Sequence, residues 1–273
     1  MLRINYRGKE YSLEELNELE NEYLKSLKYL EHRKGDIGTY VFGKEEKEAK
    51  SIYIIYKKYK NLIDLIYFAR FSAYMAFVKL HKSPTNWRDG YRGQIFIRSN
   101  YLMNSIIQYQ SVRDLLLQIL WFYLKKESLE INSKNAYDKE MKKINKDSFK
   151  KLLKTKKNDK VCEIFKKLYE GENEGENKDE FKDKKGINDY NSEMANKLKH
   201  RGIVLFKGLR DDEDFEISFS PEKNLTSKDL DYEEIDIDDY CIKYIPELNN
   251  KLINLAEELW EVLEIDSNLK KPL

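Results

Sequence analysis

The segment Gln94–Lys126 constrains the fold of this chain more than any other feature of its sequence. Its apolar residues recur at spacings of three, four or seven, which places them on one face of an α-helix. Glycine and proline, the residues that most often interrupt helices, number only 11 and 4 in a chain of 273 residues. The sequence therefore predicts an all-α fold built from long helices. The residues that carry the periodicity are Leu102, Ile106, Tyr109, Leu116, Ile119 and Tyr123.

Further helices are predicted on both sides of this segment. Ser12 followed by Glu15 forms a capping box, a common signal for a helix start, and helical spacing then continues to about His32. Residues 62–80 are apolar on almost every side, which is typical of a helix surrounded by others. The remaining helices are predicted over residues 45–80, 147–169 and 188–200, and from about Pro246 onward.

Charged residues within the apolar segment 62–80 exclude a membrane span. The segment contains Asp64, Arg70 and Lys79, whereas a span needs ~20 residues almost free of such groups. If Arg70 is buried it requires a partner, because desolvating a guanidinium group alone costs many kcal/mol. Asp114, on the predicted neighbouring helix, is the expected partner.

The helical pattern is interrupted after residue 200. Ile203–Phe206 and Phe215–Phe219 resemble short strands on either side of an acidic turn. The sequence therefore predicts a small β-hairpin insertion near residues 203–219.

Two other segments contain little that could join a core. Residues 170–186 are polar and charged, which predicts a mobile loop, and residues 207–240 form an acidic insertion. No repeat and no clear boundary divides the rest. We therefore expect residues 1–273 to form a single domain, an antiparallel helical bundle with these insertions.

The net charge of +1 excludes a globally basic nucleic-acid-binding protein. The charges are nevertheless segregated along the chain. Residues 142–160 carry nine lysines against Asp147 and Asp159, and residues 211–239 carry thirteen acidic residues against two lysines. Two interpretations stay open: solvated surfaces that neutralise each other, or a basic strip that faces phosphate groups.

Cysteine and histidine usage gives no sign of a metal or redox centre. Cys162 and Cys241 have no metal or redox spacing, and the N-terminal residues lack the apolar core of a secretion signal. These features predict a cytoplasmic protein with reduced thiols and no membrane partner. The three histidines, at positions 32, 81 and 200, lie far apart, and no Gly-rich phosphate loop is present. We therefore expect no metal site and no cofactor.

The segment Asn196–Gly202, NKLKHRG, is the most concentrated patch of candidate site residues. Asn196 and His200 are four residues apart, so they share a face of the predicted helix. Lys199, His200 and Arg201 crowd the helix C-terminus, where the helix dipole favours positive charge, and this is a sufficient structural reason for the cluster. A functional reason is equally available, because an imidazole beside a permanent cation can move a proton and hold a phosphate oxyanion.

A second group of polar residues follows the long helix 94–126. Arg98, Tyr101, Asn104 and Gln108 are separated by steps of three, three and four, which predicts one polar stripe. The stripe is interpreted either as a solvent face or structural hydrogen-bond network, or as one wall of a polar cleft.

Long helices followed by a short helix that ends in a polar-x-x-x-His-Arg patch are similar to the HEPN (higher eukaryote and prokaryote nucleotide-binding) superfamily. The resemblance rests on residues 94–126, 147–169 and above all 188–202. It implies an RNA- or nucleotide-binding protein of a toxin–antitoxin or antiviral defence system, and a metal-independent ribonuclease in the catalytic branches. The family signature places an arginine upstream of the histidine with four to six residues between the two, at positions that here hold Glu193, Met194 and Ala195.

The resemblance also implies roles for individual residues. His200 would act as general acid or base, Arg201 or Lys199 would stabilise charge on the phosphate, and Asn196 would orient the imidazole or the substrate. The absence of the upstream arginine leaves two alternatives: a non-catalytic branch that binds RNA or a nucleotide, or a branch whose cation comes from Arg98 or Arg113 on the long helix. The residues expected to contact nucleic acid are Lys199, Arg98, Asn104 and Arg113.

The partners implied by the resemblance are RNA or a nucleotide, a second copy of the chain in a homodimer, and an antitoxin protein. The alternative hypothesis is a non-enzymatic helical scaffold that acts through protein–protein contacts. In that case the 20 tyrosines, 12 phenylalanines and 3 tryptophans build the core and an interface.

Overall fold

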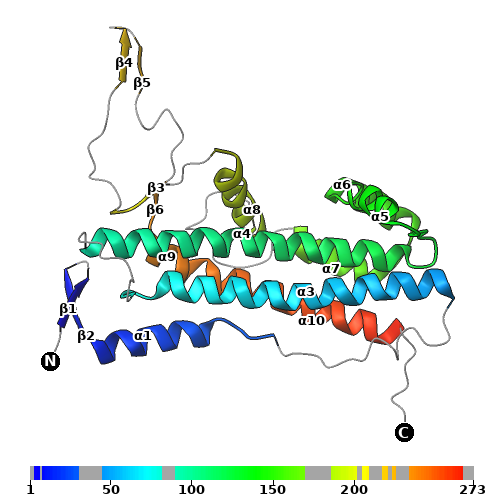
Figure 1. Cartoon of the computed structure of the whole chain (residues 1–273), viewed down its shortest axis with the longest axis horizontal. Helices are drawn as coiled ribbons and strands as arrows, with labels where there is room; N and C mark the ends of the chain where they lie inside the picture. The colour runs from blue at the N-terminus through cyan, green and yellow to red at the C-terminus, as the bar shows by residue number, and fades with distance from the viewer. Residues whose placement is uncertain are drawn as a thin grey trace. The chain divides into compact units, whose positions relative to one another are not determined.

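The computed structural model describes residues 3–6, 8–30, 45–81, 90–169, 186–201, 205–208, 217–220, 223–225 and 234–266. Most of these residues are helical, which confirms the predicted all-α class (Figure 1). The principal helices of the described chain are α1 (Leu13–Ser26), α3 (Glu46–Phe77), α4 (Gly90–Lys125), α5 (Lys134–Met141), α6 (Lys146–Thr155), α7 (Asp159–Tyr169), α8 (Ile187–Asn196), α9 (Ile237–Lys243) and α10 (Ile245–Asp266).

Contacts divide the chain into two compact units, each assembled from three separate segments. Unit 1 contains Met1–Lys28, Phe68–Ile107 and Asn191–Glu247, and unit 2 contains Tyr29–Tyr67, Gln108–Tyr190 and Leu248–Leu273. The boundaries fall inside α3, α4, α8 and α10, so these helices contribute residues to both units. The single domain expected over residues 1–273 stays a prediction.

Helices α3 and α4 run antiparallel in each unit. In unit 1 the Arg98 side chain bonds to the carbonyl of Ala76, and the Ser105 hydroxyl bonds to that of Ala69. In unit 2 the ammonium group of Lys58 donates to Gln118 at 2.6 Å. Because the partner numbers fall on one helix as they rise on the other, the predicted antiparallel bundle is confirmed.

The core of unit 2 forms where α3, α4 and α10 meet. The Tyr109 hydroxyl donates to the side-chain oxygen of Asn249 at 2.9 Å, and the Tyr59 hydroxyl donates to the carbonyl of Ala256 at 3.2 Å. The ring of Trp260 lies 4.7 Å from that of Tyr59. These tyrosines bury their rings and still satisfy their hydroxyl groups, as buried tyrosines generally must.

The N-terminal part of unit 1 begins with a two-stranded antiparallel sheet, β1 (Arg3–Tyr6) and β2 (Lys9–Ser12). Helix α1 follows at once, and the predicted capping box is confirmed: Ser12 accepts from the Glu15 N–H, and Glu15 accepts from the Ser12 N–H. The ring of Tyr23 stacks on Phe77 at 4.1 Å and joins α1 to α3.

The predicted buried pair between Arg70 and Asp114 is wrong. Asp114 is exposed, and its carboxylate accepts a hydrogen bond from Gln110 one turn earlier in α4. Arg70 is half-buried and donates to the carbonyls of Leu24 and Leu27. These carbonyls end α1 and lack helical partners, so they need donors, and the guanidinium group supplies them.

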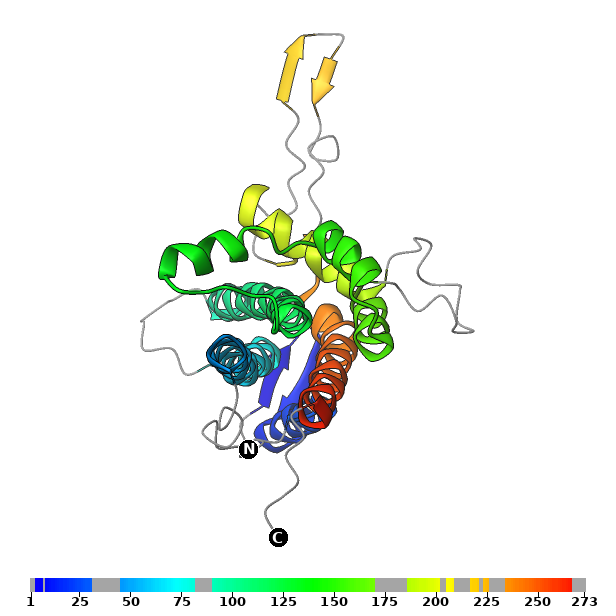
Figure 2. The same cartoon turned by 90° about the vertical axis from the view of Figure 1, so that its right-hand side faces the viewer.

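The predicted strands exist, but they pair differently from the expected hairpin. Strand β3 (Leu205–Phe206) pairs in parallel with β6 (Glu234–Ile235). Strand β4 (Ile217–Ser220) forms an antiparallel hairpin with β5 (Lys223–Leu225), seen as opposed arrows in Figure 2. The hairpin therefore spans 217–225, because the short connection after Ser220 costs less closure entropy than a loop back to residue 206.

Two predicted segments lie largely outside the described residues. The expected mobile loop 170–186 is described only at Gly186, and the acidic insertion 207–240 only at its ends and at β4 and β5. Within the described helices, none combines the length and apolar character that crossing a membrane requires.

Candidate functional site

The predicted patch around His200 lies at the C-terminal end of α8. Residues Lys197–Arg201 form a π-helical turn there, so the helix predicted over 188–200 is confirmed with a change of winding at its end. Asn196 and Lys199 are exposed. The side chains of His200 and Arg201 lie outside the described part of the structure. Single π-helical turns occur frequently at functional sites, because they displace side chains from regular helical positions.

The body of α8 is held firmly against α4. Met194 and Ala195, at two of the positions where the family signature would have arginine, are 1% and 0% exposed. The side-chain amide of Asn191 is also buried and donates to the carbonyl of Ile106 at 3.2 Å. Packing therefore leaves no room for an arginine at positions 194 and 195, since this face of α8 belongs to the core of unit 1, whereas Glu193 is exposed.

Arg113, one of the residues predicted to contact nucleic acid, is turned inward. It is 6% exposed and donates to the carbonyl of Asn188 and to the carboxylate of Asp189, both at 3.0 Å. Its guanidinium group also lies 4.3 Å from the centre of the Tyr169 ring. Arg113 thus fixes the first turn of α8 to α4, and its charge is not displayed for a phosphate.

The predicted polar stripe on α4 does not form one face. Arg98 is 1% exposed, Tyr101 and Gln108 are half-buried, and Asn104 is exposed. A step of three residues turns a helix about 60° short of a full circle, so two such steps move Asn104 about 120° away from Arg98. Of the residues predicted to contact nucleic acid, Asn104 and Lys199 are therefore exposed, and the two arginines of α4 are buried.

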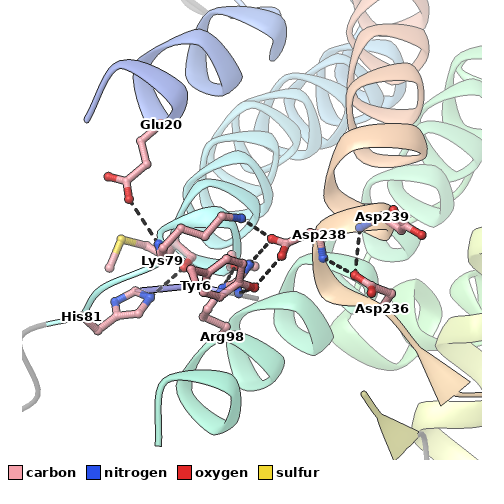
Figure 3. A network of polar contacts seen from close by, with 10 residues as sticks. Tyr6, Glu20, Lys79, His81, Arg98, Asp236, Asp238 and Asp239 are labelled. Carbon is pink, nitrogen blue, oxygen red and sulfur yellow. Dashed lines mark hydrogen bonds and ion pairs between the residues drawn. The ribbon is translucent and has the colours of Figure 1, made fainter. Parts of the chain in front are cut away.

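Arg98 is the centre of a buried polar network in unit 1 (Figure 3). Its partners are the Asp238 carboxylate on α9, the Tyr6 hydroxyl at the end of β1, 2.5 Å away, and the Ala76 carbonyl, 2.8 Å away. The ammonium group of Lys79, just beyond α3, also bonds to Asp238. Tyr6 donates its own proton to Asp238 at 2.5 Å. One carboxylate therefore receives hydrogen bonds from three side chains.

Neighbouring groups hold the two ends of this network. Asp236 caps the N-terminus of α9 by accepting the N–H groups of Asp238 and Asp239 at 3.0 and 3.2 Å, which fixes the turn that carries Asp238. On the other side, Glu20 of α1 accepts the Lys79 N–H at 3.1 Å. The network thus joins β1, α1, α3, α4 and α9.

Burial and charge together shift the pKa values of the network. Burial, reinforced by the charge of Arg98, lowers the pKa of Lys79 to about 8. Burial by itself would raise the pKa of Asp238, but Arg98 and Lys79 outweigh it and bring that pKa down to about 2. Burial raises the pKa of the Tyr6 hydroxyl and raises the pKa of the Cys241 thiol to about 12. Asp238 is therefore ionised at neutral pH, and Cys241 is an unreactive thiol.

The chemistry available to this network is structural. A lysine with a pKa near 8 can serve as a base or nucleophile when a substrate reaches it, but here its ammonium group is bonded to Asp238. Within the described chain, no group of three or more side chains is arranged to hold a metal ion. We interpret the network as the anchor that ties the N-terminal strand to the helices of unit 1.

Sequence reasoning missed Tyr6, Lys79 and Asp238 as a group. Asp238 lies in a long acidic run in which no residue stands out, and Lys79 was notable only as a charge in an apolar segment. Tyr6 and Asp238 are 232 positions apart, and no local pattern links residues at such a separation. For Arg98 the sequence left two interpretations open, a structural hydrogen-bond network and a nucleic-acid contact, and the structure places it in a buried network.

Comparison of the chain with protein families, with curated proteins and with solved structures finds no match.

Proposed function

We propose that this chain is an HEPN-like, cytoplasmic protein that binds RNA or a nucleotide through the C-terminal end of α8. The observation that carries the proposal is the π-helical turn Lys197–Arg201, which follows a firmly packed helix. Asn196, just before the turn, and Lys199, within it, are both exposed. A firmly packed helix that ends in a turn with an exposed lysine suits a phosphate group, because the position of the turn is fixed before the ligand arrives.

In the catalytic version of this proposal, His200 transfers the proton and no metal is required. Arg201 or Lys199 stabilises the negative charge on the phosphate, and Asn196 orients the imidazole or the substrate. Such an activity would suit a ribonuclease toxin or an antiviral effector.

The test compares His200→Ala, Arg201→Ala and Lys199→Ala with the wild-type chain. Labelled RNA is titrated at several salt concentrations, and cleavage is followed on a gel. For binding without cleavage, each cation substitution reduces the salt slope by about one unit, and His200→Ala changes it little. For catalysis, His200→Ala abolishes cleavage and leaves affinity nearly intact. If the turn is only a helix terminus, all three variants bind like the wild type, and the proposal fails.

A second candidate, a non-enzymatic scaffold that acts through protein–protein contacts, is favoured by exposed aromatic side chains on α3. Phe68 and Phe71, three residues apart on one helix, are 60% and 56% exposed, and exposed apolar side chains that cluster can mark a protein–protein contact. The Phe71 ring meets Tyr101 of α4 edge-on at 6.5 Å. Light scattering tests whether these side chains form an interface: self-association that the double substitution Phe68→Ser, Phe71→Ser removes would show that they do, and a chain that also binds no RNA would then favour the scaffold.

A further inference from the structure

Helix α6 and the residues just after it carry six lysines whose charges have no partner in the described chain. All six are exposed, and none forms an ion pair or a ring contact there. Two neighbouring lysines do have partners: Lys143 pairs with Glu140 at 2.8 Å, and the ammonium group of Lys146 lies 5.0 Å from the centre of the Tyr169 ring. The lysines of this surface, named here the α6 lysine face, are Lys150, Lys151, Lys154, Lys156, Lys157 and Lys160.

The packing of α6 explains why these lysines face outward. The Asn145 side chain caps the helix by accepting the Ser148 N–H at 2.9 Å. Phe149 is fully buried, with its ring 4.8 Å from Phe165 and 6.4 Å from Trp121. The apolar side of α6 is therefore used by the core of unit 2, and its opposite side presents the lysines to solvent.

The two acidic residues of the same segment do not cancel these charges. Asp147 lies in the first turn of α6 and Asp159 in the first turn of α7, where negative charge is favoured by the helix dipole. Both are exposed. Lysines therefore outnumber acidic residues along the whole of α6 and into the first turn of α7.

The length of the α6 lysine face distinguishes between classes of anion. Helix α6 has 10 residues and spans about 15 Å, and the lysines continue beyond its end. A mononucleotide carries its phosphates at one point and can therefore contact only a few of the lysines. An RNA strand carries a phosphate on every nucleotide and can neutralise the whole row, which releases counterions and favours binding.

The same surface is poorly suited to a membrane. A helix that lies on a bilayer inserts an apolar face among the lipids, in addition to its basic face. The apolar face of α6 is packed in the core, and within residues 130–169 no large apolar side chain is exposed. We infer that the α6 lysine face binds the sugar–phosphate backbone of an RNA strand, independently of sequence. The inference rests on the proposed function and narrows its ligand from RNA or nucleotide to RNA.

The test removes three charges from the face and three from elsewhere. The variant Lys150→Gln, Lys151→Gln, Lys154→Gln is compared with the control Lys25→Gln, Lys57→Gln, Lys60→Gln, which alters exposed lysines of α1 and α3. Both variants change the net charge equally, and circular dichroism confirms their folding. Labelled oligouridylate is titrated at several salt concentrations. The α6 variant should reduce the salt slope by about two units, at about 0.7 per phosphate contact, and the control should retain the wild-type slope.

Each other outcome overturns a stated part of the argument. If the wild-type chain binds no RNA, both the proposed function and this inference fail. If it binds RNA and the two variants behave alike, the inference alone fails, because only net charge matters. If Lys199→Ala and Arg201→Ala bind like the wild type and the α6 variant does not, the α8 site fails and the inference stands. Binding to phosphatidylserine vesicles without binding to RNA would overturn the inference in favour of a membrane.

Discussion

At the scale of single residues, Asp238 is the side chain on which the buried network of unit 1 depends. It is the partner of both Arg98 and Lys79, whose side chains are 1% and 9% exposed. Asp238→Asn should lower the free energy of unfolding by about 3–5 kcal/mol, because it leaves buried cations without a countercharge. Urea denaturation measures the change.

The adjacent residue provides a matched control for this substitution. Asp239 is 60% exposed and pairs with Lys243 at 3.7 Å. Asp239→Asn should therefore change the free energy of unfolding by less than about 1 kcal/mol. Equal losses in the two variants would show that the effect belongs to the N-terminus of α9 and not to the network.

Lys79 should give the network a pH dependence in the alkaline range. Its pKa in the folded chain is about 8, below the ordinary lysine value of 10.5. Between these values the unfolded chain binds more protons, so the stability contributed by this group rises with pH. The wild-type free energy of unfolding, minus that of Lys79→Met, should increase between pH 8 and pH 10. Tyr6 and Cys241 titrate in both proteins, so subtracting the two free energies of unfolding removes their contribution. If the two free energies changed with pH in the same way, the prediction would be wrong.

At the scale of elements, α8 depends on α4 for its position. Arg113 supplies two hydrogen bonds to the first turn of α8, one of them to the Asp189 carboxylate. Arg113→Met should make the amides of the first turn of α8 exchange at least about tenfold faster, because a charged hydrogen bond contributes about 1.5–3 kcal/mol. Hydrogen exchange with mass spectrometry measures the effect. Arg92→Met, at an exposed position of α4, is the control and should leave that exchange unchanged.

At the scale of the whole molecule, α3 and α4 contribute to both units, so a break in either helix affects both. We expect the chain to unfold in one cooperative transition. Trp121 and Trp260 lie in unit 2 and report on it by fluorescence once Trp87 is replaced by Phe, whereas circular dichroism reports on the helices of both units. The two urea transitions should coincide, and Asp238→Asn in unit 1 should shift both. A fluorescence midpoint that does not move would show that the units unfold independently.

Most of the helices could be predicted from the sequence, because their signals are local. The single helix predicted over 147–169 is wrong, since it is divided into α6 and α7 at residues 156–158, and α5 and α9 were not predicted. Ser12 and Glu15 predicted the start of α1, and the apolar periodicity of residues 94–126 predicted α4, since each signal depends on residues within one or two helical turns. The same patterns predicted that α8 would end near His200, although not that its last residues form a π-helical turn.

Which side chains meet depends on tertiary packing and could not be predicted from the sequence. Arg98 and Arg113 were predicted to contact nucleic acid, but the packing of α4 buries both. Their guanidinium groups donate hydrogen bonds to the carboxylates of Asp238 and Asp189. Strand β3 pairs with β6 rather than with the nearer β4. Helical or strand character depends on neighbours along the chain, whereas burial and pairing between residues 140 or 232 positions apart depend on how every element packs at once.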